Sequence, residues 1–440
     1  MTRICTCYLE LIHLHDQKGK VRTMNKKEWI KTAAAVAAAF TISATVGFGV
    51  MSNAFGTGDK TYAAESTVET QAEDETATTS DTGTASGSLN MVTGGAIDTT
   101  DLFTDRDLEQ TADVSEATTY TVSDGQTINI TSDGVYVITG TASNASIIVE
   151  AGDEDKVQLV LDGVTMTNDS TPCIYVKSAD KVFVTTTDSE NTLSVTGTFT
   201  ADGDTNTDAV IFSKDDLVLN GVGVLNIQSS DNGVTCKDDL KITGETINIV
   251  CQSDGLEAND SIRIADGEIS ISTNKDGIHA ENDDDDTVGY FYMCGGTLKV
   301  KAGDDAVHAT TIVQIDGGEL DLSAHEGLEA TWIQINDGTV NIAASDDGIN
   351  AAYKSAKISP TAEFNGGYVT IVMGSGDTDA VDSNGNLIIT GGTLDITAQS
   401  PFDYDGVCQK TGGTLIVNGT ETDTISNQMM GGGMGGRKGR

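Results

Sequence analysis

The strongest constraint on this chain is a short motif that recurs about every 22 residues. The motif is an acid or Asn, then Gly or Ala, an aliphatic residue, any residue and a small one. Successive copies begin 24, 22, 22, 29, 21, 21 and 32 residues apart, at Asp208, Asn232, Asp254, Asp276, Asp305, Glu326, Asp347 and Asp379. A second motif, Gly-Gly or Asp-Gly followed by an alternating strand, lies between the copies, as in "GGTLKVKA" and "GGTLDITA". A repeated period of this length indicates a solenoid.

The residues between these motifs alternate in polarity and show no helical pattern. Val, Ile and Leu alternate with Thr, Ser and Asn over several hundred residues, which is typical of short β-strands. Leucine-rich and ankyrin repeats are excluded because no helical segment accompanies the strands. The sequence therefore predicts an all-β fold, a parallel β-helix with glycines at its corners. The two longest steps predict outward loops at "ENDDDDTVGY" and "AYKSAKISPTAEFNGG".

Stacking of such coils places equivalent residues in columns, about 4.8 Å apart from coil to coil. The first column holds the opening residue of each motif copy, from Asp208 to Asp379. The second column lies three residues further on and contains Glu257, His279, His308, Glu329, Asn350 and Asp382. Neighbouring carboxylates at this spacing repel one another by roughly 1 kcal/mol even in water. A bound cation would reverse that repulsion.

The net charge favours cations as partners of these columns. The chain has 67 acidic and 25 basic residues, a formal net charge of -42, which disfavours nucleic acid and anionic lipid as partners. Calcium binds several oxygen ligands in flexible geometry, and the columns supply carboxylates, amides and glycine carbonyls. The predicted calcium ligands are Asp254, Glu257, Asp276, Asp304, Asp305, Glu326, Glu329, Asp346, Asp347, Asp379 and Asp382.

Two alternatives to calcium ligation stay open for the columns. Asp-Gly is a favoured corner dipeptide, so the acids also fit an interpretation as solvated turn residues. His279 and His308 interrupt the second column, and imidazole is a poor calcium ligand but a good ligand for zinc and copper. A transition-metal role for this histidine pair is therefore the second alternative.

The first 64 residues differ in composition from the repeats. From Met24 the chain reads "MNKKEWIKTAAAVAAAFTISATVGFGVM", in which lysines precede an apolar run, and small residues suited to signal peptidase follow at Ala63 and Ala64. We predict a secretory signal peptide over 24–64, with 1–23 as an over-extended start. An uncleaved membrane anchor is the alternative, since the apolar run approaches spanning length.

Composition also divides the rest of the chain. Residues 65–110 are rich in Thr, Ala, Ser, Asp and Glu and predict a disordered linker, and 426–440 form a Gly/Met-rich basic tail. The predicted β-helix occupies 111–425. This organisation predicts a protein that is secreted or held at the surface of a bacterium, with no membrane insertion of the mature domain.

Several stretches of the repeat region together resemble a known family. They include "SDGVYVITGTASNASIIVEA", "VQLVLDGVTMTN", "SKDDLVLNGVGVLNIQ", "CKDDLKITG" and "SDGLEANDSIRIADGEISIS". Over roughly residues 120–425 the chain is similar to the bacterial surface carbohydrate-binding β-helix family, of the cellulose- or polygalacturonate-binding type, which is related in fold to family 9 polysaccharide lyases. The resemblance implies a right-handed parallel β-helix, bound Ca2+ and binding of a plant cell-wall polysaccharide.

The resemblance also implies roles for individual residues. The two DDL segments add Asp215, Asp238 and Asp239 to the predicted calcium ligands, together with Asp216, and Asp260 takes the equivalent place in "NDSI". The chain departs from the family pattern at Asn232, at Glu326 and in the acidic loop 283–286. These departures leave the number and positions of the calcium ions open.

Three classes of function fit the sequence. The first is a non-catalytic polysaccharide binder, in which calcium bridges protein and uronate carboxylates, or exposed rings stack on a neutral glucan; the candidate rings are Trp332, Tyr353 and Tyr404. The second is a calcium-dependent uronate lyase, with Lys275 or Lys301 as the base. The third is a surface adhesin or a structural stalk. Kinship of fold does not establish activity, and we expect a binder rather than an enzyme.

Overall fold

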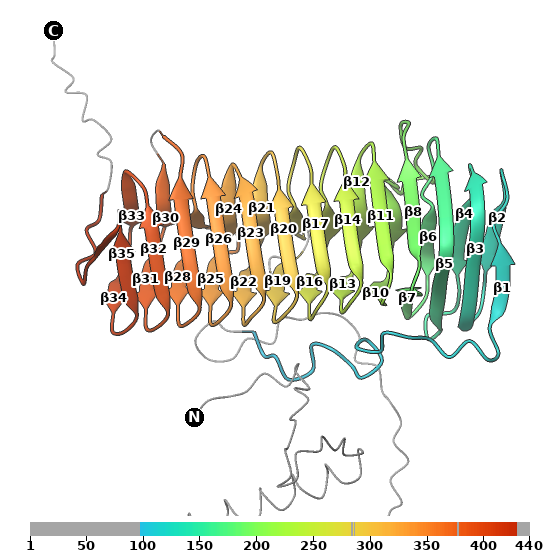
Figure 1. The fold of residues 1–440 in the computed structure, drawn as a ribbon, viewed down its shortest axis with the longest axis horizontal. Coiled ribbons are helices and arrows are strands. Elements are labelled where there is room, and N and C mark those ends of the chain that lie inside the picture. Colours follow the sequence, from blue (N-terminus) through green and yellow to red (C-terminus); the bar gives the residue numbers. More distant parts are fainter. Residues whose placement is uncertain (1–96, 283–284, 286, 376–377, 429–440) are drawn as a thin grey trace, which may run out of the picture. The chain divides into compact units, whose positions relative to one another are not determined.

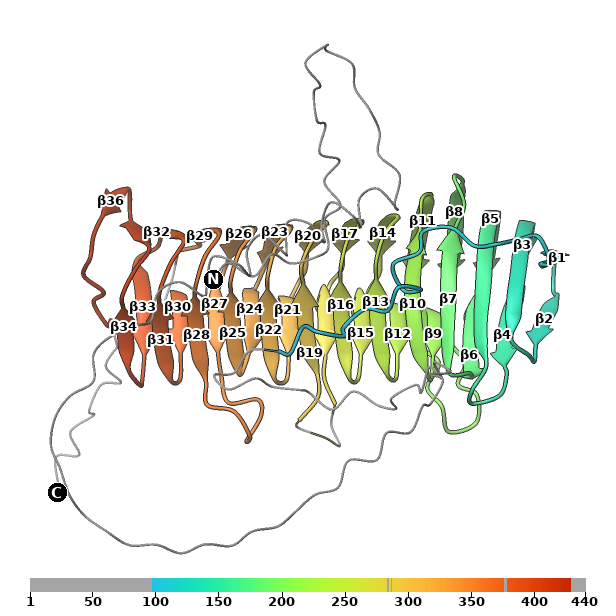
Figure 2. The same ribbon diagram turned by 90° about the horizontal axis from the view of Figure 1, so that it is seen from below.

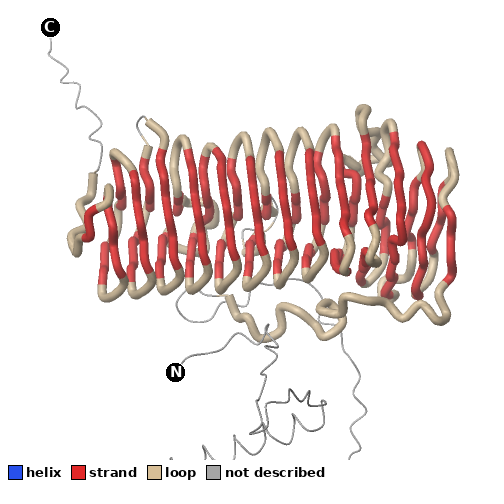
Figure 3. The backbone as a smooth tube through the Cα atoms, viewed as in Figure 1, coloured by secondary structure: helices blue, strands red, loops and turns tan. Residues whose placement is uncertain are grey.

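The computed structural model describes residues 97–282, 285, 287–375 and 378–428. The predicted signal peptide, most of the linker, part of the acidic loop and most of the tail lie outside the described residues. The described residues form strands and loops and no helix (Figure 3), which confirms the all-β prediction. In this part of the chain there is accordingly no helix of the length and apolarity that crossing a membrane requires.

Each coil of the solenoid contributes strands to three parallel sheets, and the strands of successive coils lie side by side (Figure 1). Sheet 1 contains β2 (Thr127–Ile130), β4 (Ser146–Glu150), β6 (Ile174–Ser178), β9 (Ala209–Ser213), β12 (Asn232–Cys236), β15 (Leu256–Ala258), β18 (Ile278–Ala280), β21 (Asp305–Ala309), β24 (Glu326–Ala330), β27 (Ile349–Ala351), β30 (Asp379–Ser383) and β33 (Ser400–Tyr404).

The other two sheets share their first strands. Sheet 2 contains β7 (Lys181–Thr186), β10 (Asp216–Gly221), β13 (Asp239–Ile242), β16 (Ser261–Ile264), β19 (Tyr290–Met293), β22 (Ile312–Ile315), β25 (Trp332–Ile335), β28 (Thr361–Phe364), β31 (Asn386–Ile389) and β34 (Cys408–Lys410). Sheet 3 contains β8 (Glu190–Val195), β11 (Val224–Ser229), β14 (Thr246–Val250), β17 (Glu268–Ser272), β20 (Thr297–Lys301), β23 (Glu319–Ala324), β26 (Thr339–Ala344), β29 (Tyr368–Met373), β32 (Thr393–Thr397), β35 (Thr414–Val417) and β36 (Thr420–Glu421). At the amino-terminal end, β1 (Thr118–Thr121) pairs with β3 (Gly134–Ser143), and the long strands β3 and β5 (Lys156–Asn168) run through both sheets.

Aliphatic columns fill the interior of the coils. Leu240 pairs with Ile262, which pairs with Phe291, and all three side chains are buried. Apolar area removed from water stabilises by about 25 cal/mol per Å2, so each added coil extends one continuous core. The corner between sheets 2 and 3 carries the Gly-Gly motif, and its second glycine has a positive φ, for example 77° at Gly296. The predicted parallel β-helix with glycine corners is confirmed.

The end of the predicted linker is bound to the solenoid. Residues 97–110 lie along the outer face of sheet 2 (Figure 2). The carboxylate of Asp107 is fully buried there, 3.4 Å from Lys181 Nζ and 3.1 Å from Lys241 Nζ. We call this segment the strap. Composition alone assigned it to a spacer because its short polar sequence carries no strand pattern; its contacts are decided by the cations of sheet 2.

Three insertions leave the regular coil between strands. The segment 352–360 separates β27 from β28 and corresponds to one predicted outward loop. The segment 281–289 contains the acidic loop and separates β18 from β19. Only part of it is described. A third loop, 196–208, separates β8 from β9. The loops near β9 and β28 project from the coil stack (Figure 2), and the loop before β9 contributes residues to the hollow described below.

Candidate carbohydrate- and cation-binding face

The first column of the repeat forms a hydrogen-bonded ladder at the start of the sheet 1 strands. Oδ1 of Asn232, Asp254 and Asp276 accepts the backbone N–H of the equivalent residue in the next coil, at 2.8, 3.1 and 2.9 Å. The same bond joins Asp379 N–H to Asp347 Oδ1 at 3.1 Å. One oxygen of these side chains therefore satisfies a backbone amide and fixes the distance between coils. The second oxygen remains for another partner.

The second column faces outward along the middle of sheet 1, as predicted. Residue pairing runs from Glu257 through His279, His308, Glu329 and Asn350 to Asp382. The His279 and His308 rings are stacked, with centroids 4.9 Å apart and planes 15° from parallel. The first column lies beside the second, so the side chains of the two columns form one continuous polar face.

In the middle of this face the protein supplies its own cations. His279 Nδ1 lies 2.7 Å from Asp276 Oδ2, and His308 Nδ1 lies between Asp305 Oδ2 at 3.1 Å and Glu329 Oε2 at 2.9 Å. Additional cations come from Lys275, which contacts Asp254, from Lys354, which contacts Glu329, and from Lys237, which contacts Glu257. Most carboxylates predicted as calcium ligands in this stretch are therefore already paired.

The pKa values in the middle region follow from this pairing. Burial alone would lower the pKa of His279, but hydrogen bonds with Asp276 and Glu281 raise it to about 10. Burial likewise opposes the hydrogen bond of His279 to Asp276, which nevertheless holds the Asp276 pKa below its usual value. The pKa of Glu329 falls to about 2 because His308 and Lys354 outweigh burial. Asp305, which shares His308 with Glu329, keeps a pKa raised by burial to about 6.

The carboxyl-terminal part of the face has the same geometry and no such cations. Burial raises the pKa of Asp347 to about 7, and the neighbouring carboxylates of Asp382, Asp346 and Asp379 add to it. The pKa of Asp382 rises to about 6 through burial and then through Asp403 and Asp379. Among the described residues, the groups with the largest effects on these two pKa values include no Lys, Arg or His. Repulsion between half-buried carboxylates therefore adds to the cost of burial here.

Glu326, Asp304 and Asp346 lie at the boundary between the middle and the carboxyl-terminal part of the face. The pKa of Glu326 is raised to about 8 by burial and by Glu329 and Asp305, although its Oε2 accepts a hydrogen bond from Asn350 at 2.9 Å. Asp346 lies 3.9 Å from His325, and the Asp304 carbonyl accepts the His325 amide.

The DDL segments build a second acidic cluster at the corner between sheets 1 and 2. Carboxylate oxygens of Asp216, Asp238 and Asp239 lie within 4.8 Å of one another. The pKa of Asp238 is raised to about 7 by burial, then by Asp216 and Asp239. Arg263 compensates Asp239 at 2.6 Å, whereas Asp215 accepts the Ala179 amide.

The oxygen ligands fit calcium at the carboxyl-terminal acids and at the Asp238 corner, and they fit it less well around the two histidines. The carboxyl-terminal acids and the Asp238 corner offer several oxygen atoms whose charge repulsion a divalent cation would relieve, which is the chemistry calcium prefers. Around His279 and His308 the carboxylates are engaged by imidazoles, so a calcium ion would have to displace existing ion pairs. When bound, calcium would neutralise the carboxylates and leave coordination positions for an external oxygen.

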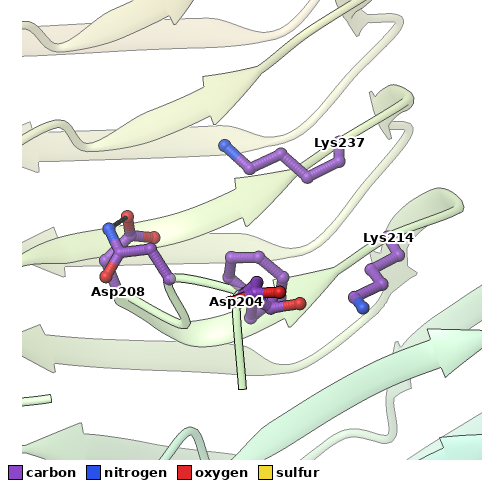
Figure 4. Close-up of a pocket in the computed structure, with 7 residues that line it drawn as sticks. Asp204, Asp208, Lys214 and Lys237 are labelled. Atoms are coloured by element: carbon purple, nitrogen blue, oxygen red, sulfur yellow. Dashed lines mark hydrogen bonds between the residues drawn. The ribbon is translucent and has the colours of Figure 1, made fainter. Parts of the chain in front are cut away.

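A hollow lies on the outer face of sheet 1, towards the amino-terminal end of the second column (Figure 4). Its volume is about 500 Å3, and it is lined by Asp204, Thr205, Asn206, Asp208, Phe212, Lys214 and Lys237. Lys214 and Lys237 extend across it towards the side where Asp204 and Asp208 lie. Phe212 also borders the hollow, but its side chain is fully buried. The hollow thus offers ammonium groups and hydrogen-bond acceptors.

Three lysines follow the ends of successive sheet 1 strands at this hollow. Val176 pairs with Ser213, which pairs with Cys236, so that Lys177, Lys214 and Lys237 occupy the same corner of three coils. Lys177 binds Asp202 at 2.6 Å, and Lys237 binds Glu257 at 2.7 Å. In the described part of the chain, no hydrogen bond or ion pair engages the Lys214 ammonium group, and the residue is exposed. This lysine column is a local concentration of positive charge on an acidic protein.

The three aromatic residues proposed from the sequence lie on separate elements. Trp332 faces outward on β25, but it is half-buried against Ile358 and the strap residue Ile97, and its Nε1 donates to Glu363 at 3.2 Å. Tyr353 lies in the loop after β27 and is 71% exposed. Tyr404 ends β33 and packs partly against the core. The structure does not bring these rings together into one platform.

Sequence reasoning missed several residues of this face. Asp204 and Asn206 lie in a loop outside the repeat, so their approach to the lysine column depends on the fold. Glu281 follows His279 by two residues and contacts its Nε2 at 2.9 Å; the His-x-Glu spacing was the available signal. Lys214 and Lys237 open the two KDDL segments, so the signal for the lysine column is present in the sequence.

Taken together, the structure is a parallel β-helix with one charged face and a hollow on that face, an arrangement suited to an extended ligand. A family model described as "Carbohydrate-binding domain-containing protein" matches residues 124–380, more than half of the chain. The chain belongs to this family, and its class of function is carbohydrate binding. The family suspected from the sequence is confirmed at this level.

Two individual proteins illustrate the relationship. A carbohydrate-binding domain-containing protein of Acetivibrio thermocellus is 44% identical over 200 residues, which make up 44% of this chain and 70% of the relative. A solved polysaccharide lyase-like protein from C. thermocellum, studied as a gadolinium derivative, is 23% identical over 68% of this chain and 96% of its own, with a TM-score of 0.40. A likeness of this size says nothing about function.

Proposed function

We propose that this chain is an exported, calcium-binding, non-catalytic protein that binds polysaccharide of the plant cell wall, either acidic pectin-type polymers or cellulose. The observation that carries the proposal is the hollow on the outer face of sheet 1, in a chain that belongs to a carbohydrate-binding family. The face runs along the solenoid axis, so a linear polymer has room on both sides of the hollow. Export and attachment to the cell surface rest on the predicted signal peptide.

The chemistry of the hollow favours a sugar that carries negative charge. Lys214 offers an exposed ammonium group that makes no ion pair among the described residues, and the carboxylates of Asp204 and Asp208 can accept hydrogen bonds from sugar hydroxyls. Asp208 has a pKa raised to about 6 by burial and by Glu257, against the opposing effect of Lys237. A uronate carboxylate placed beside Lys214 and Lys237 would complete the ion pairs of this site.

Calcium enters the proposal at the carboxyl-terminal acids and at the Asp238 corner, where Asp239 and Asp216 already pair with Arg263 and Lys181 but the Asp238 pKa stays raised. The raised pKa values of Asp347, Asp382 and Asp238 identify carboxylates that gain most from a divalent cation. Calcium bound at the carboxyl-terminal acids lies on the same face as the hollow. It would hold this end of the face together and offer free positions to uronate carboxylates further along the polymer.

A lyase is the second candidate, and the environment of its proposed base argues against it. Lys275 Nζ is 3.1 Å from Asp254 Oδ2, and this carboxylate raises the lysine pKa although partial burial works in the opposite direction. A base with a raised pKa stays protonated near neutral pH and cannot accept the α-proton of a uronate. Lys301, the other candidate, is exposed on sheet 3, on a different side of the coil from the acids.

The decisive experiment measures retention of the full chain on polygalacturonate, pectin, cellulose and xylan, in calcium and then in EDTA. We expect retention on at least one polymer without new ultraviolet absorbance from unsaturated uronates. Rising absorbance would make the protein a lyase. An absence of retention on every polymer in both buffers would leave an adhesin or a structural stalk as the function.

Variants of the exposed lysines locate the site. We expect Lys214→Gln to weaken binding of an oligogalacturonate about 10-fold, the effect of losing roughly 1.4 kcal/mol from one charge-assisted contact. Lys299→Gln is the matched control, because Lys299 is an exposed lysine on β20 of sheet 3 and its replacement removes the same charge elsewhere. Equal binding by both variants would move the site away from the hollow.

A further inference from the structure

A second kind of binding site lies in the middle of the charged face, where two imidazoles and a carboxylate converge. His279 on β18 and His308 on β21 are paired residues of adjacent coils. Glu281, just after β18, places its Oε2 at 2.9 Å from His279 Nε2 and 3.9 Å from His308 Nε2. Ligand atoms of the three side chains all lie within 4.8 Å of one another. These are three potential ligands around one point.

One of these nitrogens has no hydrogen-bond partner. Only 8% of His308 is exposed, and its Nε2 is buried without a hydrogen bond among the described residues. A buried polar atom without a partner costs about 1–3 kcal/mol, so its persistence calls for an explanation. The atom is directed to the side where Glu281 and His279 Nε2 lie, which is where a bound cation would satisfy it.

The opposite nitrogen of each ring is held by carboxylates. His279 Nδ1 is bonded to Asp276, and His308 Nδ1 contacts both Asp305 and Glu329. In metal centres a carboxylate that accepts the other N–H of a ligating histidine fixes its tautomer and its orientation. Here both Nδ1 atoms have such an acceptor, which leaves both Nε2 atoms for ligation. The backbone ladder of the first column keeps these acceptors in place.

We propose that His279 Nε2, His308 Nε2 and a Glu281 carboxylate oxygen form a binding site for a borderline-soft divalent cation such as Zn2+. With bonds of about 2.0–2.1 Å, tetrahedral zinc ligands lie about 3.3 Å from each other. The observed separations of 2.9 and 3.9 Å bracket this value. The rings are stacked nearly in parallel, so a small rotation of each imidazole is needed to direct both lone pairs at one ion.

Zinc and calcium are expected to separate on this face according to ligand type. Two imidazole nitrogens favour zinc and related transition metals, whereas calcium prefers oxygen ligands only. Three protein ligands leave a fourth position for water or for an oxygen of a bound sugar. The site is thus independent of the calcium proposal and lies between the hollow and the carboxyl-terminal acids.

The test is zinc titration of the full chain in excess calcium, in a background with Cys5, Cys7, His13 and His15 replaced, because these residues of the amino-terminal segment also offer zinc ligands. We expect one zinc ion per chain. His308→Gln and Glu281→Gln should each weaken zinc binding at least about 100-fold, beyond the 10–100-fold typical of outer-shell changes. His325→Gln, which alters an exposed histidine outside the trio, should change it less than about 2-fold.

A spectroscopic measurement keeps the test independent of stability. Cobalt bound in place of zinc should give visible d–d bands of a nitrogen- and oxygen-ligated ion, and these should vanish in Glu281→Gln, a change of one atom in a half-exposed side chain. The proposal is overturned if the background chain binds no zinc. It is also overturned if His308→Gln and Glu281→Gln, folded as judged by circular dichroism, retain the affinity of the background chain.

Discussion

The middle and the carboxyl-terminal part of the sheet 1 face are built from the same motif and differ in their electrostatics. In the middle, Asp276 and Glu329 are paired with imidazoles and have lowered pKa values. At the carboxyl-terminal part, Asp347 and Asp382 occupy equivalent positions and have raised ones. The backbone geometry is shared, so the difference comes from the residue that the second column contributes. A column of acids is therefore stable without metal where histidines alternate with it, and gains from calcium where they do not.

The largest effect should come from breaking a pair in the middle. We expect Asp276→Ala to lower the free energy of unfolding by about 3 kcal/mol, because the His279 cation keeps only Glu281 as its partner and the variant also removes the acceptor of an amide. Urea denaturation in calcium and in EDTA measures this loss. The loss should be the same in both buffers; a loss confined to the calcium buffer would mean that Asp276 acts as a calcium ligand.

The strap offers the same paired chemistry on sheet 2. We expect Asp107→Asn to cost about 3 kcal/mol at pH 7, since Lys241 loses its buried partner and Lys181 keeps only Asp216, at 3.4 Å. Despite burial, these lysines lower the pKa of Asp107 below its usual value of 3.8, so the contribution is present above pH 4 and is lost as the pH falls through the lowered pKa. Unfolding of both proteins across pH 2–8 should therefore converge in acid. A constant difference at every pH would contradict ion pairing as the cause.

At the carboxyl-terminal part of the face, whether removing acids stabilises or destabilises the protein should depend on calcium. In EDTA, Asp347→Asn with Asp382→Asn should raise the free energy of unfolding by about 1–2 kcal/mol, because two repelling charges are removed. In calcium the same double variant should be about 2 kcal/mol less stable than the parent, since it lacks ligands. Calorimetric melting with and without calcium measures both values. Stabilisation in both buffers would argue against a calcium site at these two residues.

The smallest effect should come from giving the carboxyl-terminal part of the face a histidine like those of the middle. Asp382→His places an imidazole at the column position that His279 and His308 occupy in the middle. We expect about 1 kcal/mol of stabilisation in EDTA and a weaker response of the melting temperature to calcium, because the protein then supplies part of the counter-charge itself. Asp395→His, on the outer face of sheet 3, is the matched control and should leave the calcium response unchanged.

Much of the fold was predictable from the residues, because the repeat imposes it. The acid-Gly-aliphatic motif and the Gly-Gly corners specify the coil, and the two columns follow from its constant spacing: Glu257, His279 and His308 are neighbours in space as they are in the repeat. The residues that pair with the two columns were harder to predict from the sequence. Lys354 reaches Glu329 from an irregular loop, and the period says nothing about loop conformation.

The sequence by itself determined a solenoid with two stacked columns of polar side chains, because a period of about 22 residues with alternating strands has few other ways to bury its aliphatic residues. Only the tertiary structure decided which of those charges are compensated. It placed the strap on the cations of sheet 2, brought Asp204 and Asp208 to the lysine column, and set Glu281 beside two imidazoles. Those contacts join segments whose separation along the chain follows no period, and electrostatic free energy depends on distance and burial rather than on order in the sequence.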